Sequence, residues 1–420
     1  MNNKNRLGGL RIFFTLIALT VLLLSACPSD PVPGRESERD FSHGGIEKAT
    51  DNTKRLWNYL TDMYGNYIIS GQMDAAWANN GDLDMISRVF TDTGKYPAIK
   101  GFDFIDLPNS WGGFGQDQVD EAIEWWNGEN KNNTQAGAAT KLLPDKPEIR
   151  GIVTFCWHWR MPAIEGSNQE FYVLTPNRNN RNSTDFRIPM KDGELDTESA
   201  EYQRIVEDLD KVAVLLQQLK DLDIPVLWRP LHEAAGNWSA SRPNGAWFWW
   251  GASGPGPYIA LWEFMYEYLS KEKGLNNLIW VWNGQHVSWY PDPATVDIVG
   301  YDFYPWPRDT PERARQYGSQ SLTFNRARNM ADGQRMVALT ENGAIPNPDL
   351  CKEDNAMWLW FMVWNDARRD TWIAQNGPDD AENFWSGEFH NTNAHKNHVY
   401  NHNLVITLDK LPNLTTYRLQ

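Results

Sequence analysis

Short apolar runs followed by polar, loop-rich stretches recur along this chain, and they constrain its fold more than any other feature. Most runs are continuously apolar rather than alternating, which is typical of strands buried on both faces of a sheet. Between them lie amphipathic segments with apolar residues at helical spacing, such as 199–222 and 258–269. Eight such strand–helix units predict an α/β fold of the (β/α)8 TIM barrel type. The runs are 67–71, 98–104, 149–159, 224–233, 278–282, 296–304, 336–341 and 358–364.

The length of 420 residues fits one large barrel, since such barrels run about 250 residues and grow by insertions in their loops. We find no internal repeat and no second composition regime, so we expect a single catalytic domain over residues 45–420. An open doubly wound sheet would need a Gly-rich phosphate turn after its first strand, and the sequence Gly71-Gln72-Met73 lacks one. Long polar stretches at 109–145 and 162–197 are predicted to be loops on the C-terminal face, where substrates bind to barrels.

Residues 1–26 have the pattern of an export signal, with basic residues ahead of an apolar run too short to span a bilayer comfortably. The run ends in Leu24-Ser25-Ala26-Cys27, which resembles the bacterial lipoprotein box, where the Cys is acylated and becomes the first mature residue. Residues 27–44, rich in proline and charge, are predicted to be a flexible tether. The alternative is a plain signal peptide in which Cys27 occurs by chance.

Lipidation at Cys27 predicts attachment to the cell envelope. The next residue is Pro28 rather than Asp, which disfavours retention in an inner membrane, so we expect the outer membrane or the cell surface. No other stretch is long and apolar enough to cross a bilayer, and contact with the membrane is therefore expected only through the lipid anchor. We expect the protein to be a monomer.

The formal net charge of −15 argues against a nucleic-acid partner, because phosphate would be repelled. The aromatic content is unusual, with 22 Trp, 15 Tyr and 17 Phe. These residues either fill a heavily packed core or line a sugar-binding cleft, since flat indole faces stack on the apolar faces of pyranose rings. Composition alone favours the cleft over the core.

Neither a disulfide framework nor a metal centre is predicted. Cys156 lies in an apolar run and is expected to be buried, and a bridge to Cys351 stays open. His395, His398 and His402 have the spacing of one helical face. However, no Cys or carboxylate completes a known zinc spacing, and the Asn-rich stretch is expected to be solvated. We expect no cofactor.

Two glutamates directly follow apolar strands, where a charge is costly unless it is paired or used. They are Glu233, at the end of the fourth run, and Glu341, at the end of the seventh. One such residue alone is explained equally well by an ion pair, for example with Arg229. Two of them, three strands apart on an eight-strand ring, can face each other across the barrel mouth. Retaining glycoside hydrolysis needs two carboxyl groups about 5–5.5 Å apart.

The surrounding sequence resembles glycoside hydrolase family 26, most of whose characterised members are endo-β-1,4-mannanases. The segment Trp228-Arg229-Pro230-Leu231-His232-Glu233, followed by Gly236-Asn237-Trp238 and by Trp247-Phe248-Trp249-Trp250-Gly251, is similar to the family's strand-four signature. Most of the clan to which this family belongs has Asn before the acid/base Glu, whereas the family has His, as here at His232. The resemblance extends from Ile69-Ser70-Gly71-Gln72 to Leu339-Thr340-Glu341-Asn342-Gly343, most of the chain after the tether.

The resemblance implies that Glu233 is the acid/base and Glu341 the nucleophile. The family's nucleophile is more often followed by Phe-Gly, whereas this chain has Asn342-Gly343. The resemblance also implies that Tyr304 holds the nucleophile, with Tyr301 as the alternative.

Four further residues match sugar-binding positions of the family. His158 matches a strand-three His that contacts the sugar at the −1 subsite, and His232 would hydrogen-bond near the scissile sugar. Trp238 matches an aromatic residue five positions after the acid/base, and Trp364 matches a sugar platform on strand eight. The alternatives are a strand-end cap for His232 and core packing for the two Trp residues.

These observations together predict a retaining endo-β-1,4-mannanase that cuts mannan, glucomannan or galactomannan. Other activities of the family remain open, namely β-1,3-1,4-glucanase, β-1,3-xylanase and exo-acting mannobiohydrolase. A glycan-binding surface lipoprotein without catalysis is a further alternative. Such a protein usually lacks one of the two carboxylates, and both are present here.

Overall fold

The structure, a computed structural model, describes residues 46–75, 84–107, 114–130, 140–161, 170–173, 183–239, 244–368 and 370–419. The region Phe41–Gln420 forms one compact unit. The predicted export signal at 1–26, the predicted lipidation site Cys27 and the predicted tether at 27–44 lie outside the described residues, so they remain predictions.

Among the described residues, eight parallel strands close into a barrel, and each predicted apolar run overlaps one of them. The strands follow one another around the barrel in chain order, and the last pairs with the first through Trp360 and Ile69. The predicted TIM barrel is thereby confirmed. The strands are Ile68–Met73 (β1), Ile99–Asp103 (β2), Ile152–Cys156 (β5), Val226–Arg229 (β8), Leu278–Trp282 (β9), Ile298–Phe303 (β10), Met336–Asn342 (β11) and Trp360–Val363 (β12), and Val405–Ile406 (β13) pairs with the start of β1.

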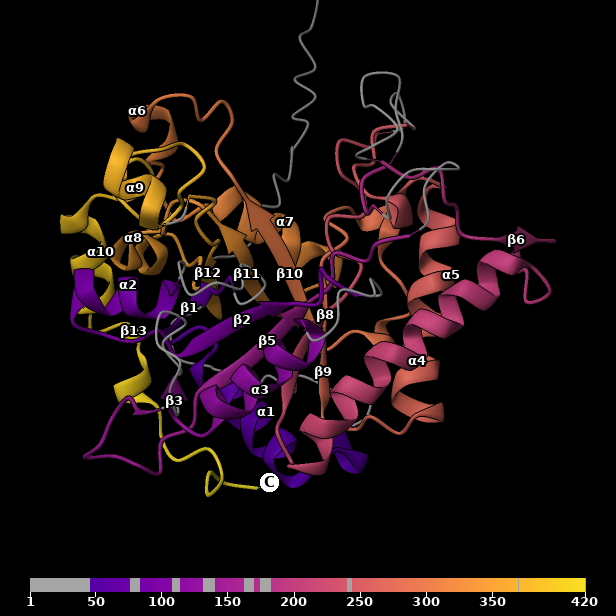
Figure 1. Ribbon diagram of the computed structural model, residues 1–420, viewed down its shortest axis with the longest axis horizontal. Helices are drawn as coiled ribbons and strands as arrows, with labels where there is room; N and C mark the ends of the chain where they lie inside the picture. The colour runs from indigo at the N-terminus through magenta and orange to yellow at the C-terminus, as the bar shows by residue number, and fades with distance from the viewer. Residues whose placement is uncertain are drawn as a thin grey trace, which may run out of the picture. The chain divides into compact units, whose positions relative to one another are not determined.

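The helices lie around the outside of the strands (Figure 1). The predicted helix at 199–222 is confirmed as α4, whose start is capped by Ser199 accepting a hydrogen bond from the Tyr202 amide at 3.1 Å. The predicted helix at 258–269 begins earlier, because Pro255 already has the φ angle that a first helical residue needs. The helices are Asp51–Met63 (α1), Met85–Thr93 (α2), Phe114–Trp126 (α3), Ala200–Asp221 (α4), Pro255–Tyr266 (α5), Pro311–Ala314 (α6), Ser321–Met330 (α7), Pro348–Glu353 (α8), Asp370–Asn376 (α9) and Asn393–Tyr400 (α10).

None of the helices in the described ranges is both long enough and apolar enough to cross a bilayer.

The polar stretch at 109–145 is not a single loop, so this prediction was wrong. Helix α3 occupies its middle and packs against the barrel through the fully buried Val119, Ala122 and Trp125. The Trp125 ring also donates a hydrogen bond to the Ile152 carbonyl at 3.1 Å. Asn- and Gly-rich flanks concealed this short helical pattern in the sequence. The remaining strands form two small hairpins, Glu129–Asn130 (β3) with Thr140–Lys141 (β4), and Met190–Lys191 (β6) with Glu194–Leu195 (β7).

Most of the aromatic content fills the core rather than a cleft, contrary to what composition favoured. Thirteen of the 22 Trp residues are at most 1% exposed, and all residues of β5, β8, β9 and β12 are buried. Indole rings stack on one another outside the barrel strands, as Trp157 does on Trp159 with centroids 4.2 Å apart. The large apolar area of each ring makes it an efficient core residue.

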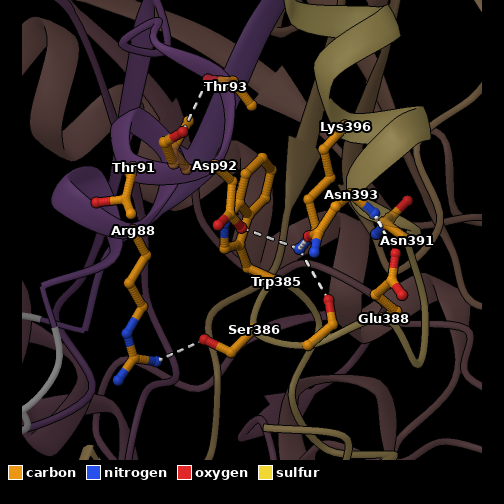
Figure 2. A network of polar contacts seen from close by, with 12 residues as sticks. Arg88, Thr91, Asp92, Thr93, Trp385, Ser386, Glu388, Asn391, Asn393 and Lys396 are labelled. Carbon is orange, nitrogen blue, oxygen red and sulfur yellow. Dashed lines mark hydrogen bonds and ion pairs between the residues drawn. The ribbon is translucent and has the colours of Figure 1, made fainter.

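A buried lysine fastens the C-terminal segment to α2, and the segment is not solvated as predicted. Lys396 in α10 is fully buried, and its Nζ donates to Asp92 Oδ2 at 3.0 Å, to the Gly387 carbonyl at 2.8 Å and to Asn393 Oδ1 at 3.0 Å. The ammonium also lies 5.1 Å from the centroid of the Trp385 ring (Figure 2). Three acceptors and an aromatic face therefore replace the water that this charge loses on burial.

Lys396→Met should lower the free energy of unfolding by roughly 3 kcal/mol, because removing one member of a buried ion pair leaves its partners without a donor. We expect the lower end of the range for such pairs, since Asp92 is 28% exposed. Urea unfolding followed by Trp fluorescence measures the effect. Lys191→Met, which removes an exposed ion pair with Glu198, is the matched control and should change stability by less than about 0.5 kcal/mol. Equal stability of the two variants would contradict this role of Lys396.

Candidate active site

Two residues with left-handed backbone shape the end of β8. Leu231 has φ 52° and Glu233 has φ 49°, conformations that cost non-glycine residues on the order of 1–3 kcal/mol each. The neighbouring strand holds this turn in place, because the Glu233 amide donates to the Asn283 carbonyl at 2.7 Å and the Ala235 amide to the Gly284 carbonyl at 3.2 Å. The strained turn sets His232 fully inside the protein, while Glu233 keeps 9% of its surface exposed.

Glu341, near the end of β11, has a hydrogen-bond donor on each carboxylate oxygen. Arg229 Nη2 donates to Oε1 at 2.6 Å, and the Tyr304 hydroxyl donates to Oε2 at 2.8 Å. Burial, followed by the charges of Glu341 and Asp302, raises the pKa of Tyr304 well above its usual range, so this hydroxyl keeps its proton. Tyr301 lies elsewhere, with its hydroxyl accepting from Arg326 at 3.4 Å. The structure therefore places Tyr304, and not Tyr301, against Glu341.

A third acid, Asp302, belongs to the same site and was not among the predicted site residues. The pairing of β10 with β11 shifts register between Tyr301 and Asp302, which sets Asp302 beside Glu341. Its Oδ2 accepts from Arg229 at 3.2 Å and its Oδ1 from the Thr340 hydroxyl at 2.6 Å. The sequence signal that could have found it is a charge within an apolar run, since Asp302 lies inside the run 296–304.

Glu233, Asp302 and Glu341 each bring a carboxylate oxygen within 4.8 Å of the other two. Of the described guanidinium groups, that of Arg229 contacts this cluster, bonding Asp302 and Glu341 but not Glu233. Burial, then the charges of Asp302 and Glu341, raise the pKa of Glu233 well above its usual range, although Arg229 acts in the opposite direction. Burial and the Glu341 charge also raise the pKa of Asp302 to about 7.

Glu233 also has a polar neighbour on the next strand. Gln285, which follows β9 in a left-handed conformation with φ 63°, donates from Nε2 to Glu233 Oε1 at 3.4 Å. A neutral amide donor fixes the direction of the carboxyl group without adding a charge. Within the described ranges, the two predicted catalytic residues thus differ in environment, since Glu341 contacts a cation and Glu233 contacts a neutral donor.

His158 and His232 lie side by side next to the carboxylates. The His158 side chain is 11% exposed, and its ring lies 5.9 Å from that of Trp364, measured between centroids. His232 is fully buried, and its Nε2 lies 3.2 Å from His158 Nε2 and 3.9 Å from Glu341 Oε1. Because His232 is fully buried, it cannot contact a sugar directly, and its predicted hydrogen bond near the sugar would be indirect.

The predicted aromatic residues lie around the same end of the barrel. Trp238 is half-buried and packs edge-on against His286 and Trp289 at centroid distances of 4.9 and 6.1 Å. Trp364 is also half-buried, so neither side chain belongs entirely to the core. Trp306, which the sequence did not single out, is 84% exposed on the loop after β10. These partly exposed indoles are surfaces on which sugar rings can stack.

His398 and His402 meet a carboxylate that the sequence spacing did not reveal. Asp349 of α8 lies with Oδ1 3.1 Å from His402 Nε2 and with Oδ2 3.8 Å from His398 Nε2. The Leu404 amide donates to His402 Nδ1 at 3.2 Å, so Nε2 carries the ring proton and donates to Asp349. That tautomer leaves no lone pair at Nε2 for a metal ion.

The three C-terminal histidines do not share one helical face, contrary to the sequence prediction. His395 turns into the interior, where its Nε2 contacts the Ile345 carbonyl at 2.8 Å and its ring stacks on Tyr317 at a centroid distance of 3.6 Å. Two further groups of described residues bring metal-ligand atoms together, Asp103 with Cys156 and His158, and the three carboxylates around Arg229. Cys156 and Cys351 are both buried free thiols, so they form no bridge.

An eight-stranded parallel barrel with paired acids at the ends of its fourth and seventh strands defines a glycoside hydrolase of the barrel type. The chain belongs to glycosyl hydrolase family 26, whose family model matches residues 46–410. The family resemblance seen in the sequence is thereby confirmed.

Several known proteins are similar to this chain. It is 33% identical over 350 residues to a mannan endo-1,4-beta-mannosidase of Thermothelomyces thermophilus, covering 82% of this chain and 61% of the relative. It is 31% identical to the crystal structure of a Podospora anserina β-(1,4)-mannanase, with a TM-score of 0.66 over 92% of this chain and 72% of that one. A β-mannanase from a symbiotic protist of the termite Reticulitermes speratus, complexed with gluco-manno-oligosaccharide, is 27% identical, with a TM-score of 0.65 over 89% and 98% of the two chains.

The chain spans only part of the length of the curated relatives. It covers 61% of the Thermothelomyces protein, and 54% and 50% of two mannan endo-1,4-beta-mannosidases of a Piromyces species.

Asp302→Asn should move the alkaline limb of the pH profile of kcat/KM to lower pH. The predicted acid Glu233 works only while protonated, and the Asp302 charge is the second-largest cause, after burial, of its raised pKa. Without that charge Glu233 loses its proton at a lower pH, and activity falls earlier as pH rises. Initial rates between pH 4 and 10, a range of about six units that brackets carboxyl titration, measure the limb.

Asp297→Asn is the matched control for this variant, since Asp297 is equally buried at the opposite end of the same strand and accepts from the Trp280 amide at 2.7 Å. Its pH profile should match that of the wild type. An Asp302→Asn profile with an unmoved or raised alkaline limb would contradict the electrostatic account.

Proposed function

We propose that this protein is a retaining endo-β-1,4-mannanase that hydrolyses mannan, glucomannan or galactomannan. The observation that carries the retaining mechanism is the carboxylate pair, with oxygens of Glu233 and Glu341 within 4.8 Å of each other. Inverting enzymes keep their two carboxyl groups roughly 6.5–9.5 Å apart, to leave room for a water molecule, so the closer pair here supports the retaining mechanism.

In the first step Glu233 donates its proton to the glycosidic oxygen while a Glu341 oxygen attacks the anomeric carbon. The raised pKa of Glu233 keeps that proton available at neutral pH. Arg229 and Tyr304 each hold one oxygen of Glu341, so the attacking carboxylate is already oriented before the sugar arrives. The products are a glycosyl ester on Glu341 and a released sugar with a free hydroxyl.

In the second step Glu233 acts as a base. Formation of the ester removes the negative charge of Glu341, which is one of the causes of the raised pKa of Glu233. The pKa of Glu233 therefore falls once the ester forms, and the carboxylate can take a proton from the attacking water. One residue thus serves both steps because the charge of its neighbour changes between them.

The choice of mannan rests on similarity rather than on the catalytic pair. Three curated relatives are named mannan endo-1,4-beta-mannosidases, and the termite-symbiont structure contains a gluco-manno-oligosaccharide. A β-1,3-1,4-glucanase, a β-1,3-xylanase or a mannobiohydrolase would use the same two acids. These activities are therefore the competing outcomes of the experiment below.

Purified protein should release a ladder of oligosaccharides from β-1,4-mannan and glucomannan, since an endo-acting enzyme cuts at internal linkages. Reducing-sugar release with product sizing on mannan, mixed-linkage glucan and β-1,3-xylan measures substrate and mode of action together. Strong activity on glucan or xylan with none on mannan would overturn the substrate. Release of mannobiose alone would overturn the endo mode.

Two variants serve as controls for that assay. Glu233→Ala should lower kcat by roughly 10²–10⁴-fold, the usual contribution of a general acid. Glu341→Ala should lower it by at least about a thousandfold, because the covalent step is lost. Full turnover in both variants would show that other residues perform the chemistry.

We also propose that the protein is anchored to the cell envelope by a lipid on Cys27. The support for this proposal is the sequence Leu24-Ser25-Ala26-Cys27, which ends an apolar run. Expression in a Gram-negative host with labelled palmitate should give a labelled membrane-associated product. The Cys27→Ser variant should carry no label, and equal labelling of the two proteins would contradict the proposal.

A further inference from the structure

An aspartate and two histidines form a buried chain beside Glu341. Asp103, at the end of β2, contacts His158 through both of its carboxylate oxygens. Its Oδ1 accepts from the His158 amide at 3.0 Å, and its Oδ2 lies 2.5 Å from His158 Nδ1. The Gln118 side chain holds the Asp103 backbone by binding both its amide and its carbonyl. The other end of the chain is the 3.2 Å contact between His158 Nε2 and His232 Nε2.

The geometry determines which nitrogen carries each proton. A carboxylate only accepts, so His158 Nδ1 holds a proton and donates it to Asp103. The neutral His158 ring then has a lone pair at Nε2, and His232 must donate to it from Nε2. The remaining His232 nitrogen, Nδ1, is buried without a hydrogen-bond partner among the described residues, which suits an unprotonated nitrogen better than an N–H group.

The neutral form of His232 agrees with its surroundings. Burial, then the neighbouring His158 and Arg229, holds the pKa of His232 well below its usual range. A doubly protonated His158 would reverse the bond between the two rings and force an unpaired N–H at His232 Nδ1. The arrangement with one proton on each ring avoids that buried donor.

We propose that Asp103 is a positioning residue of the active site, which fixes the tautomers of His158 and His232 so that the N–H of His232 lies on Nε2 and is donated to His158 Nε2. The reversed tautomers would bury an unpaired N–H at His232 Nδ1 and favour a shift of the His232 ring. His232 Nε2 lies 3.9 Å from Glu341 Oε1, so such a shift would disturb the carboxylate that Arg229 and Tyr304 orient. The inference rests on the proposed role of Glu341.

The same assignment changes how His158 meets the substrate. Both of its ring nitrogens are bonded within the protein, so its exposed part offers the sugar carbon atoms rather than a hydrogen bond. Phe171 and Phe248 lie 4.9 and 5.6 Å from the His158 ring, and Trp364 lies 5.9 Å away. His158 therefore belongs to a cluster of aromatic rings beside the carboxylates.

The tautomers can be measured directly in the wild-type protein. NMR of protein labelled with 15N-histidine, assigned with His158→Gln and His232→Gln variants, should find the proton of His158 on Nδ1 and that of His232 on Nε2. A proton on His158 Nε2, alone or together with one on Nδ1, would overturn the proposal. This measurement needs no turnover, so its failure is distinct from failure of the proposed hydrolase activity.

Asp103→Asn tests the consequence, because the amide has the shape of the carboxylate but donates to His158 Nδ1 and so drives the proton to Nε2. We expect kcat to fall roughly ten- to a hundredfold, as for other residues that orient a histidine from behind, with little change in KM and with the altered tautomer in the spectrum. Wild-type kcat in this variant would overturn the proposal.

Asp208→Asn is the matched control. Asp208 is an equally buried carboxylate that accepts from Trp159 Nε1 at 3.0 Å, outside the chain of histidines. It should leave kcat and both tautomers unchanged. A fall in kcat as large as that of Asp103→Asn would show a general effect of losing a buried carboxylate and would overturn the proposal. If Asp103→Asn does not fold, the wild-type spectrum still decides.

Discussion

Among the described residues, one buried cation faces three buried acids, and this imbalance is the constraint on which the active site depends. Arg229 bonds Glu341 and Asp302 inside the barrel mouth, and Glu233 stands within 4.8 Å of both without touching the guanidinium. Three carboxylate charges cannot be balanced by one guanidinium at low dielectric, so one acid must hold a proton. Glu233 has no cationic contact in the part of the chain that the structure describes, and its pKa lies well above its usual range. The division of labour between acid and nucleophile follows from this imbalance.

The barrel brings these charged residues together. Arg229, Asp302 and Glu341 come from three different strands, and the register shift of β10 is what sets Asp302 level with Glu341. Glu233 stands on a strained turn that the end of β9 holds by backbone hydrogen bonds. Strain of this kind persists where the surrounding structure fixes it, and here the closed sheet does so.

The sequence predicts the parts of this protein that depend on local pattern. Continuous apolar runs mark all eight strands, and a charge directly after such a run identifies Glu233 and Glu341. This signal did not identify Asp302 or Asp103 as site residues, because each lies inside an apolar run. The partner of Asp302 is Arg229 and that of Asp103 is His158, and both partners come from other strands. Helix α3 was missed because its flanks are Asn-rich, and the buried Lys396 because its charged partner, Asp92, is far away in sequence. Long-range pairing of polar groups is invisible to periodicity.

Trapping the covalent intermediate tests the central claim most directly. In a 2-deoxy-2-fluoro mannosyl fluoride, the fluorine at C2 slows both steps of the reaction. The fluoride at C1 is a good leaving group, so the first step still proceeds, and the glycosyl ester accumulates on whichever carboxylate attacks. Mass spectrometry of the digested protein should find the fluorosugar on the peptide that carries Glu341. Label on Glu233 or Asp302, or hydrolysis with inverted anomeric configuration and no label, would contradict the assignment of the anionic and the protonated acid.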